Sequence, residues 1–200
     1  FYGPKLHPVD ETSLQYIEIG NNCRITSGVT ILAHDYSYAV LRPVYHCMLC
    51  KTGITTIGDN VFVGMHSIIT MGVTVGNNVI IGAGSVVTKD VPSNVVVAGN
   101  PAKVICTLEE YYYKNNEKFD EYAKLMYKRQ KSILGRELEE NEMGWFIALW
   151  DSKIREEVVS KLHVDGDNPE AVYKDVIDFP SKYKSFNEFR ESMLWEKKEE

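Results

Sequence analysis

Residues 57–92 read IGDNVFVGMHSIITMGVTVGNNVIIGAGSVVTKDVP, and an aliphatic residue returns at every sixth position of this stretch. Counting in sixes, the first positions are Ile57, Val63, Ile69, Val75, Ile81 and Val87. Earlier units of six begin at Ile19, Ile25 and Ile31, so all nine first positions are Ile or Val. Fifth positions are small or β-branched except at Asp35, and a second-position glycine recurs at residues 20, 58, 64, 76 and 82.

A period of six matches neither the 3.6-residue period of a helix nor the simple alternation of a strand. It predicts short strands that turn a corner every six residues, so that three sixes form an 18-residue coil stacked on the one before. We expect the first-position aliphatic residues to fill the interior, and Gly and Asn to serve the unusual backbone angles of the corners. An ordinary Val-rich β-sandwich would instead show period two with irregular turns.

The chain divides into two halves of unlike composition. Charged residues make up 12 of the first 105 residues and 38 of the last 95. We therefore predict a repeat domain over residues 1–105 and a helical extension over residues 106–200. The capping-box spacing from Thr107 to Glu110 predicts a helix that ends before Gly135. Further helices are expected near residues 137–150, 151–162 and 185–198.

Overall composition limits the class of protein. The 200 residues carry a formal net charge of −6, and binding to a nucleic-acid backbone needs a basic field instead. No stretch approaches the roughly 20 apolar residues of a membrane span, so no transmembrane segment is expected. The sequence shows no signal peptide, and its four cysteines are too unevenly spaced for a disulfide framework. These features favour a cytoplasmic protein.

The repeat is interrupted once, because 26 residues separate Ile31 from Ile57 where whole sixes would give 24. This break predicts an inserted loop over residues 36–56, which is rich in aromatic residues and has a proline. Loops of this length inside compact domains are usually functional or disordered. Since its tyrosines can pack, we expect an ordered, functional loop.

Residues 81–105, IGAGSVVTKDVPSNVVVAGNPAKVI, together with IGDNVFVG at 57–64, resemble the hexapeptide-repeat acyltransferases. The resemblance spans about residues 15–105 and is strongest to the sugar and capsular-polysaccharide O-acetyltransferase branch. It implies a mainly β fold, a left-handed parallel β-helix followed here by an α-helical region. It also implies acetyl-CoA as the co-substrate and a homotrimer with the CoA cleft between adjacent subunits.

The acceptor side of the expected site centres on His34, at the fourth position of its six and just before the inserted loop. A neutral imidazole can accept a proton from a sugar hydroxyl. The resemblance implies that a histidine at this place is the general base. Asp35 either orients that imidazole or shapes the turn. Tyr36 and Tyr38 are expected to bind the acceptor, and His66 to line the cleft or an intersubunit surface.

The donor side of the expected site includes Lys89 and Lys103, two of only six basic residues in the first half. The resemblance implies that both contact the phosphates or the adenosine of CoA. It further implies contacts of Ala83 and Thr88 with the pantetheine, and of Phe62 and Met65 with the acetyl end. Related proteins often have Trp where Phe62 stands.

The motif from His46 to Cys50, with cysteines at 47 and 50, could bind zinc or perform redox chemistry. Zinc takes about four ligands, and the sequence supplies no second Cys-x-x-Cys or His pair. We expect no metal, and we interpret Cys47 and Cys50 as apolar packing residues of the loop.

Together these features predict an O-acetyltransferase that moves acetyl from acetyl-CoA directly to a sugar hydroxyl in a ternary complex. An N-acetyltransferase acting on an amino sugar is the alternative within the same class. A non-catalytic β-helix scaffold, or a relative of the carbonic anhydrases with this fold, is the alternative from another class. The anhydrases need three metal-binding histidines at a spacing that this chain lacks.

Overall fold

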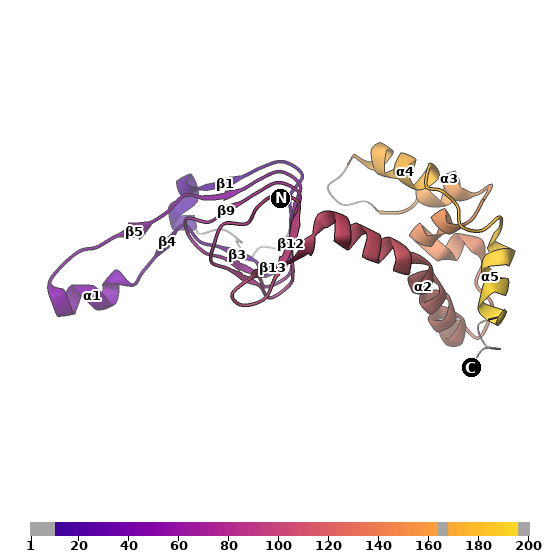
Figure 1. The fold of residues 1–200 in the computed structure, drawn as a ribbon, viewed down its shortest axis with the longest axis horizontal. Coiled ribbons are helices and arrows are strands. Elements are labelled where there is room, and N and C mark those ends of the chain that lie inside the picture. The colour runs from indigo at the N-terminus through magenta and orange to yellow at the C-terminus, as the bar shows by residue number, and fades with distance from the viewer. Residues whose placement is uncertain (1–10, 164–167, 196–200) are drawn as a thin grey trace. The chain divides into compact units, whose positions relative to one another are not determined.

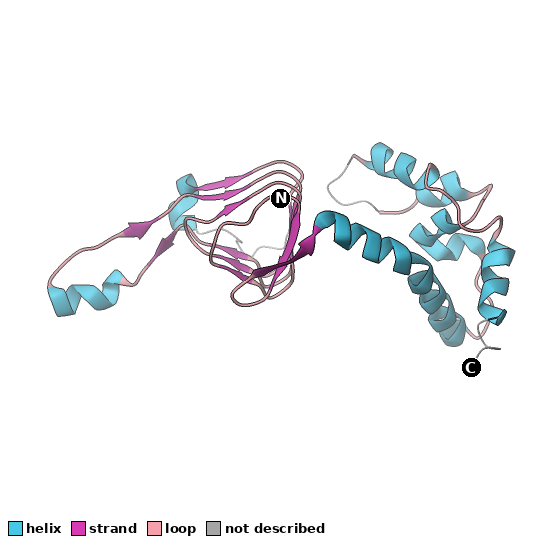
Figure 2. Cartoon of the chain, viewed as in Figure 1, coloured by secondary structure: helices cyan, strands magenta, loops and turns pink. Residues whose placement is uncertain are grey.

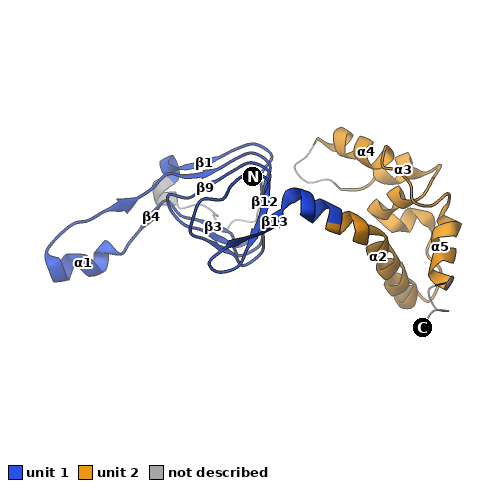
Figure 3. Ribbon diagram, in the orientation of Figure 1, with its two compact units in different colours: residues 1–113 blue, residues 114–200 orange. Residues whose placement is uncertain are grey.

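The computed structural model describes residues 11–163 and 168–195. The chain forms two compact units, residues 1–113 and residues 114–200 (Figure 3). The division lies inside helix α2 (Leu108–Leu134). Each unit has its own hydrophobic core, one built from the repeats and one from the helices.

The repeats of the first unit form three sheets that the chain visits in turn, and their strands are parallel except for β13 (Figures 1 and 2). The β6 sheet contains β1 (Ile17–Ile19), β6 (Thr55–Ile57) and β9 (Thr74–Val75). The β7 sheet contains β2 (Arg24–Ile25), β7 (Val61–Val63), β10 (Val79–Ile81), β12 (Val95–Ala98) and the antiparallel β13 (Lys103–Thr107). The β8 sheet contains β3 (Thr30–Ile31), β8 (Ile68–Ile69) and β11 (Val86–Val87).

The register of these sheets confirms the predicted coil length. Ile57 pairs with Val75, and Val63 pairs with Ile81, each 18 residues further along the chain. The last coil is two residues shorter, because Ile81 pairs with Val97. The sequence did not predict β13, which pairs with β12 and covers an edge that would otherwise offer unpaired backbone groups.

First-position side chains form the core of the first unit, as predicted. From Ile31 onward every one of them is at most 1% exposed. The fifth-position hydroxyls are also buried, and each finds a backbone partner. Ser67 Oγ donates to the Gly82 carbonyl at 3.0 Å, and Ser85 Oγ donates to the same carbonyl at 2.5 Å. Buried hydroxyls are therefore satisfied inside the stack of coils.

Asparagines and glycines serve different purposes at the corners. Asn22, Asn60, Asn78 and Asn94 adopt positive φ angles of 53–62°, and their side-chain amides form a hydrogen-bonded ladder with spacings of 2.8–3.2 Å. The second-position glycines do not have positive φ angles, which corrects the expectation that corner angles require them. A Cβ on Gly64 would lie 2.5 Å from the backbone nitrogen of the next coil, so close stacking of coils excludes a side chain there.

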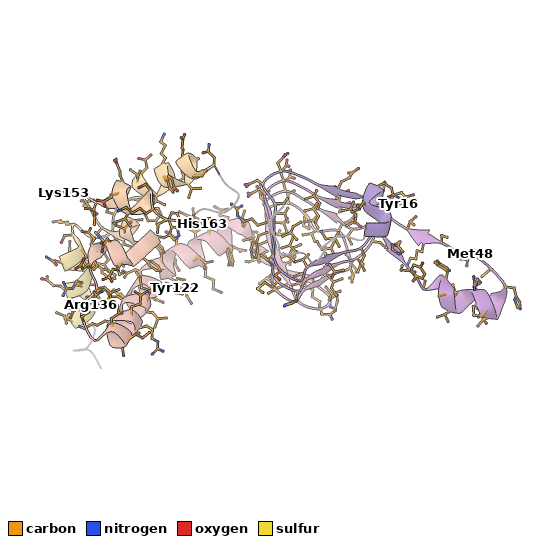
Figure 4. The ribbon with its side chains drawn as sticks, turned by 180° about the vertical axis from the view of Figure 1, so that it is seen from behind. Tyr16, Met48, Tyr122, Arg136, Lys153 and His163 are labelled. Carbon is orange, nitrogen blue, oxygen red and sulfur yellow. The ribbon has the colours of Figure 1, made fainter. Side chains whose placement is uncertain are left out.

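The inserted segment is an arm rather than a plain loop. We use "the arm" for residues 34–52, in which β4 (His34–Asp35) pairs antiparallel with β5 (Lys51–Thr52) and α1 (Tyr38–Tyr45) lies between them. The predicted boundary of 36–56 is too long, because Thr55 and Thr56 already pair with β1. None of the residues of α1 is buried, and Met48, beyond the helix, is 61% exposed (Figure 4).

The second unit is helical, as predicted. Glu110 N donates to Thr107 Oγ1 at 3.1 Å and Thr107 N donates to Glu110 Oε2 at 2.8 Å, which confirms the capping box that opens α2. Gly135 follows the helix with a φ of 67°. The remaining elements are η2 (Glu140–Leu149), α3 (Arg155–Val159), α4 (Pro169–Ile177) and α5 (Phe186–Trp195), with η1 (Glu11–Tyr16) preceding β1 in the first unit.

Two helix predictions need correction, and one helix was missed. The expected helix over 137–150 is a 3₁₀ segment broken at Gly144, whose φ of 55° and ψ of −131° are not helical. The helix expected over 151–162 is short, and α4 was not predicted although Asn168 and Pro169 form a cap and first-turn signal. Residues 196–198 of the last expected helix lie outside the described part. No helix among the described residues has the length and apolar character to cross a membrane.

Candidate functional site

His34 lies in β4, where the chain leaves the stacked coils and enters the arm. Its backbone pairs with Thr52 of β5, so both strands of the arm fix its position. The imidazole is partly buried and meets the ring of Tyr36 edge-on, with ring centroids 5.7 Å apart. The partly exposed ring is thereby held at the base of the arm.

Asp35 is engaged by the turn that follows it. The backbone N–H and the hydroxyl of Ser37 donate to Asp35 Oδ1 at 3.0 and 2.5 Å, and Lys51 Nζ lies 3.3 Å from Oδ2. The hydrogen bonds from Ser37, and then Lys51, hold the pKa of the Asp35 carboxyl below its usual value. These contacts support the turn-shaping alternative, and a catalytic role of Asp35 stays a prediction.

Tyr36 and Tyr38 form an aromatic surface beside His34. Their ring centroids lie 5.1 Å apart, and the side chain of Tyr36 is 67% exposed. The hydrogen bond with Tyr36 raises the pKa of the Tyr38 phenol. The Tyr38 phenol therefore stays protonated at neutral pH, and the two tyrosines present ring faces and hydroxyl groups to a ligand.

The other expected residues are distributed over two corners of the coils. The exit corner, where the chain leaves the β8 sheet, carries residues 32–34, 70–72 and 88–90, since Ile31, Ile69 and Val87 are in register. Thr88 and Lys89 therefore share this corner with His34, and both are exposed. They lie two coils away from His34, which corresponds to about 10 Å.

The entry corner, where the chain enters the β8 sheet, carries Met65, His66 and Ala83. Gly84 N donates to the Met65 carbonyl at 2.8 Å, which stacks two coils there. Phe62 lies on β7 and is 40% exposed, and Lys103 begins β13 of the same sheet. Phe62 also borders a shallow hollow of about 160 Å³ that Arg24 and Leu108 line.

The structure thus brings the expected residues together in two groups rather than one. Within a coil, six residues separate Met65 of the entry corner from Met71 of the exit corner. An extended chain of that length spans up to about 20 Å. In a single chain, most of the expected donor contacts are therefore separated from His34 by a face of the coil stack.

Sequence reasoning missed the residues that brace the base of the arm. Ser37 and Lys51 hold Asp35 and tie the two arm strands together. The Asp-x-Ser spacing at 35–37 is a local turn signal that was available in the sequence. The Lys51 partner depends on strand pairing across the arm, which local sequence does not reveal. Cys47 and Cys50 are free thiols, and among the described residues no three His, Cys, Asp or Glu side chains gather as metal ligands would.

Comparison with known proteins identifies the family of this chain. Residues 54–89 match the family model described as the hexapeptide repeat of succinyl-transferase. The galactoside O-acetyltransferase of Escherichia coli (strain K12) is 43% identical over 108 residues, half of each chain. Protein CapG of Staphylococcus aureus is 48% identical over 125 residues, which are 62% of this chain and 72% of CapG. The chain belongs to the hexapeptide-repeat acetyltransferases.

A solved structure titled as a galactoside acetyltransferase in complex with coenzyme A is 42% identical to this hexapeptide-repeat acetyltransferase. It matches with a TM-score of 0.41 over 46% of this chain and 44% of that one. The acetyltransferase described here spans about half the length, or less, of the two galactoside-specific relatives. The predicted membership in the sugar O-acetyltransferase branch is confirmed.

Proposed function

We propose that this protein transfers the acetyl group of acetyl-CoA to a hydroxyl of a sugar or of a sugar-containing polysaccharide precursor. The observation that carries the proposal is the placement of His34 at the base of the arm, beside the exposed ring of Tyr36, which in turn contacts the half-buried ring of Tyr38. A sugar ring lying on these tyrosines would bring its hydroxyl to the imidazole. A cytoplasmic location, where acetyl-CoA is available, is part of the same proposal.

In this mechanism the neutral imidazole of His34 takes the proton of the acceptor hydroxyl as the oxygen attacks the thioester carbonyl. The carbonyl becomes a tetrahedral oxyanion, which backbone N–H groups lining the cleft would stabilise. Collapse breaks the carbon–sulfur bond, and the imidazolium returns the proton to the departing CoA thiolate. The route needs no nucleophilic cysteine, since both substrates are bound together.

A homotrimer of left-handed β-helices is part of the same proposal. In one chain the two groups of expected residues lie on different corners. In a trimer, the entry corner of a neighbouring copy would lie beside His34. Donor contacts from one subunit and the base from the next would then form one cleft. We expect light scattering at micromolar concentration to give three times the 22.8 kDa chain mass. A monomer at that concentration would contradict the shared site.

The function is tested by following CoA release from acetyl-CoA over a panel of sugars, with analysis of the acetylated products. Hydroxyl acceptors should be turned over, with the ester as product. Products acetylated only on amines would establish the N-acetyltransferase alternative. Absence of CoA binding would favour a scaffold.

We expect Lys89→Ala and Lys103→Ala each to weaken CoA binding by roughly 10- to 100-fold. Each removes a charge-assisted contact to phosphate of about 1.5–3 kcal/mol. Calorimetric titration with CoA measures the loss, and Lys118→Ala, which removes an exposed lysine of α2, is the matched control. Unchanged affinity in both test variants would show that the donor site is misplaced.

A further inference from the structure

His66 adopts a backbone conformation that its neighbours in the stack reserve for glycine. Its φ is 58°, and the corresponding entry-corner residues of the coils on either side are Gly28 and Gly84, with φ angles of 74° and 68°. A side chain in the left-handed region costs free energy, so such residues persist where surrounding structure fixes them, often at functional sites. His66 is exposed and contributes nothing to the core, so packing does not explain this cost.

The imidazole of His66 lies directly on the backbone of Gly28. A Cβ added to Gly28 would be 2.2 Å from Nδ1 and 2.6 Å from Cε1 of that ring. The His66 N–H also donates to the carbonyl of Ser27 at 3.1 Å, which fixes the backbone of the two coils against each other. Gly28 is therefore needed both for its own positive φ and as the surface on which the ring rests.

The coil that carries Gly84, on the other side of His66, has free space beside its backbone. A Cβ added to Gly84 would meet no atom within 4 Å, and Ala83 before it is exposed. Ala83 and Gly84 thus leave a strip of backbone with no side chain larger than a methyl group beside the histidine. A narrow chain of atoms can lie along such a strip and reach its backbone groups.

We propose that His66 hydrogen-bonds the pantetheine arm of CoA, and that Gly28 is the positioning residue that holds its imidazole in place. A neutral imidazole has one N–H donor and one nitrogen acceptor, which match the amide groups of pantetheine. The inference rests on the proposed function and on the contact between Ala83 and pantetheine that the sequence resemblance implies. It moves His66 from the acceptor side, where the sequence suggested it, to the donor side.

The test is calorimetric titration of CoA into the full-length protein and three variants. His66→Gly removes the ring and suits the positive φ, so we expect a well-folded protein with roughly tenfold weaker CoA binding. Gly28→Ala displaces the His66 ring and should weaken CoA binding by about the same factor. Gly135→Ala, just after α2 and outside both corners, is the matched control, because its φ is 67° and its added Cβ meets no atom within 4 Å. It carries the same backbone cost, and its CoA affinity should stay within about twofold of wild type.

A double variant separates positioning from general damage. Gly28→Ala added to His66→Gly should cause no further loss of CoA affinity, since no ring remains to be displaced. Wild-type CoA affinity in both single variants would overturn the inference, and so would a rise in acceptor KM with CoA affinity unchanged. Failure of the wild-type protein to bind CoA would overturn the proposed function along with it.

Discussion

We expect His34→Ala to lower kcat by about 10²- to 10⁴-fold, the contribution that general-base assistance makes to proton transfer. The imidazole lies at the base of the arm and only partly buried, so its removal leaves no core cavity. Fold, assembly and CoA affinity should therefore stay close to wild type. Steady-state kinetics on the acceptor found in the sugar panel measure kcat. Circular dichroism checks the fold, and calorimetric titration measures CoA affinity.

A second substitution at the same position separates proton transfer from hydrogen bonding. His34→Asn should fail like His34→Ala, because an amide holds a hydrogen bond but does not take the proton. The control is His66→Gly, which should keep most of kcat at saturating CoA. Full turnover by His34→Ala would refute the mechanism.

We expect Trp150→Ala to destabilise the helical unit by about 3–5 kcal/mol, the range measured in other proteins for removal of a large buried aromatic side chain. The indole is fully buried, and its ring centroid lies 5.0 Å from that of Phe186 and 5.1 Å from that of Phe189. Its Nε1 also donates to Glu140 at 2.6 Å, so the variant leaves a cavity and an unpaired carboxylate. Urea unfolding followed by circular dichroism at a helical wavelength measures the loss.

Trp145 provides the matched control, because it belongs to the same segment but is 36% exposed. Trp145→Ala should cost much less than Trp150→Ala. The two cores are built from separate sets of residues, so the repeat unit should keep its own unfolding transition in Trp150→Ala. Equal losses in the two variants would contradict the burial that distinguishes these tryptophans.

Much of the repeat unit was predictable because each hexapeptide meets the same local requirement. An aliphatic residue at position one must be buried, and a period of six allows this only in short strands joined at corners. The capping box at Thr107 and the end of α2 at Gly135 are equally local signals. The two-residue phase error between Ile31 and Ile57 revealed an insertion without revealing its structure.

Helix α1 and strand β13 were not predicted, for two different physical reasons. The arm has no buried apolar face, which is the feature that identifies an amphipathic helix in a sequence. Its apolar residues are at least 61% exposed at Val40, Val44, Tyr45 and Met48. Strand β13 reverses direction after the repeat has ended and pairs with β12 in antiparallel fashion. The six-residue period of the sequence gives no information about this reversal.

The sequence by itself determined the stacked parallel coils, the position of the insertion and the identity of the candidate base. Only the tertiary structure decided where the candidate residues lie relative to one another. It separated His34 from Met65 and Ala83 by placing them on two corners, and it set the ring of His66 on Gly28, 38 residues away in the chain. Such contacts depend on how one coil is registered on the next, which is a property of the stack and of no single hexapeptide.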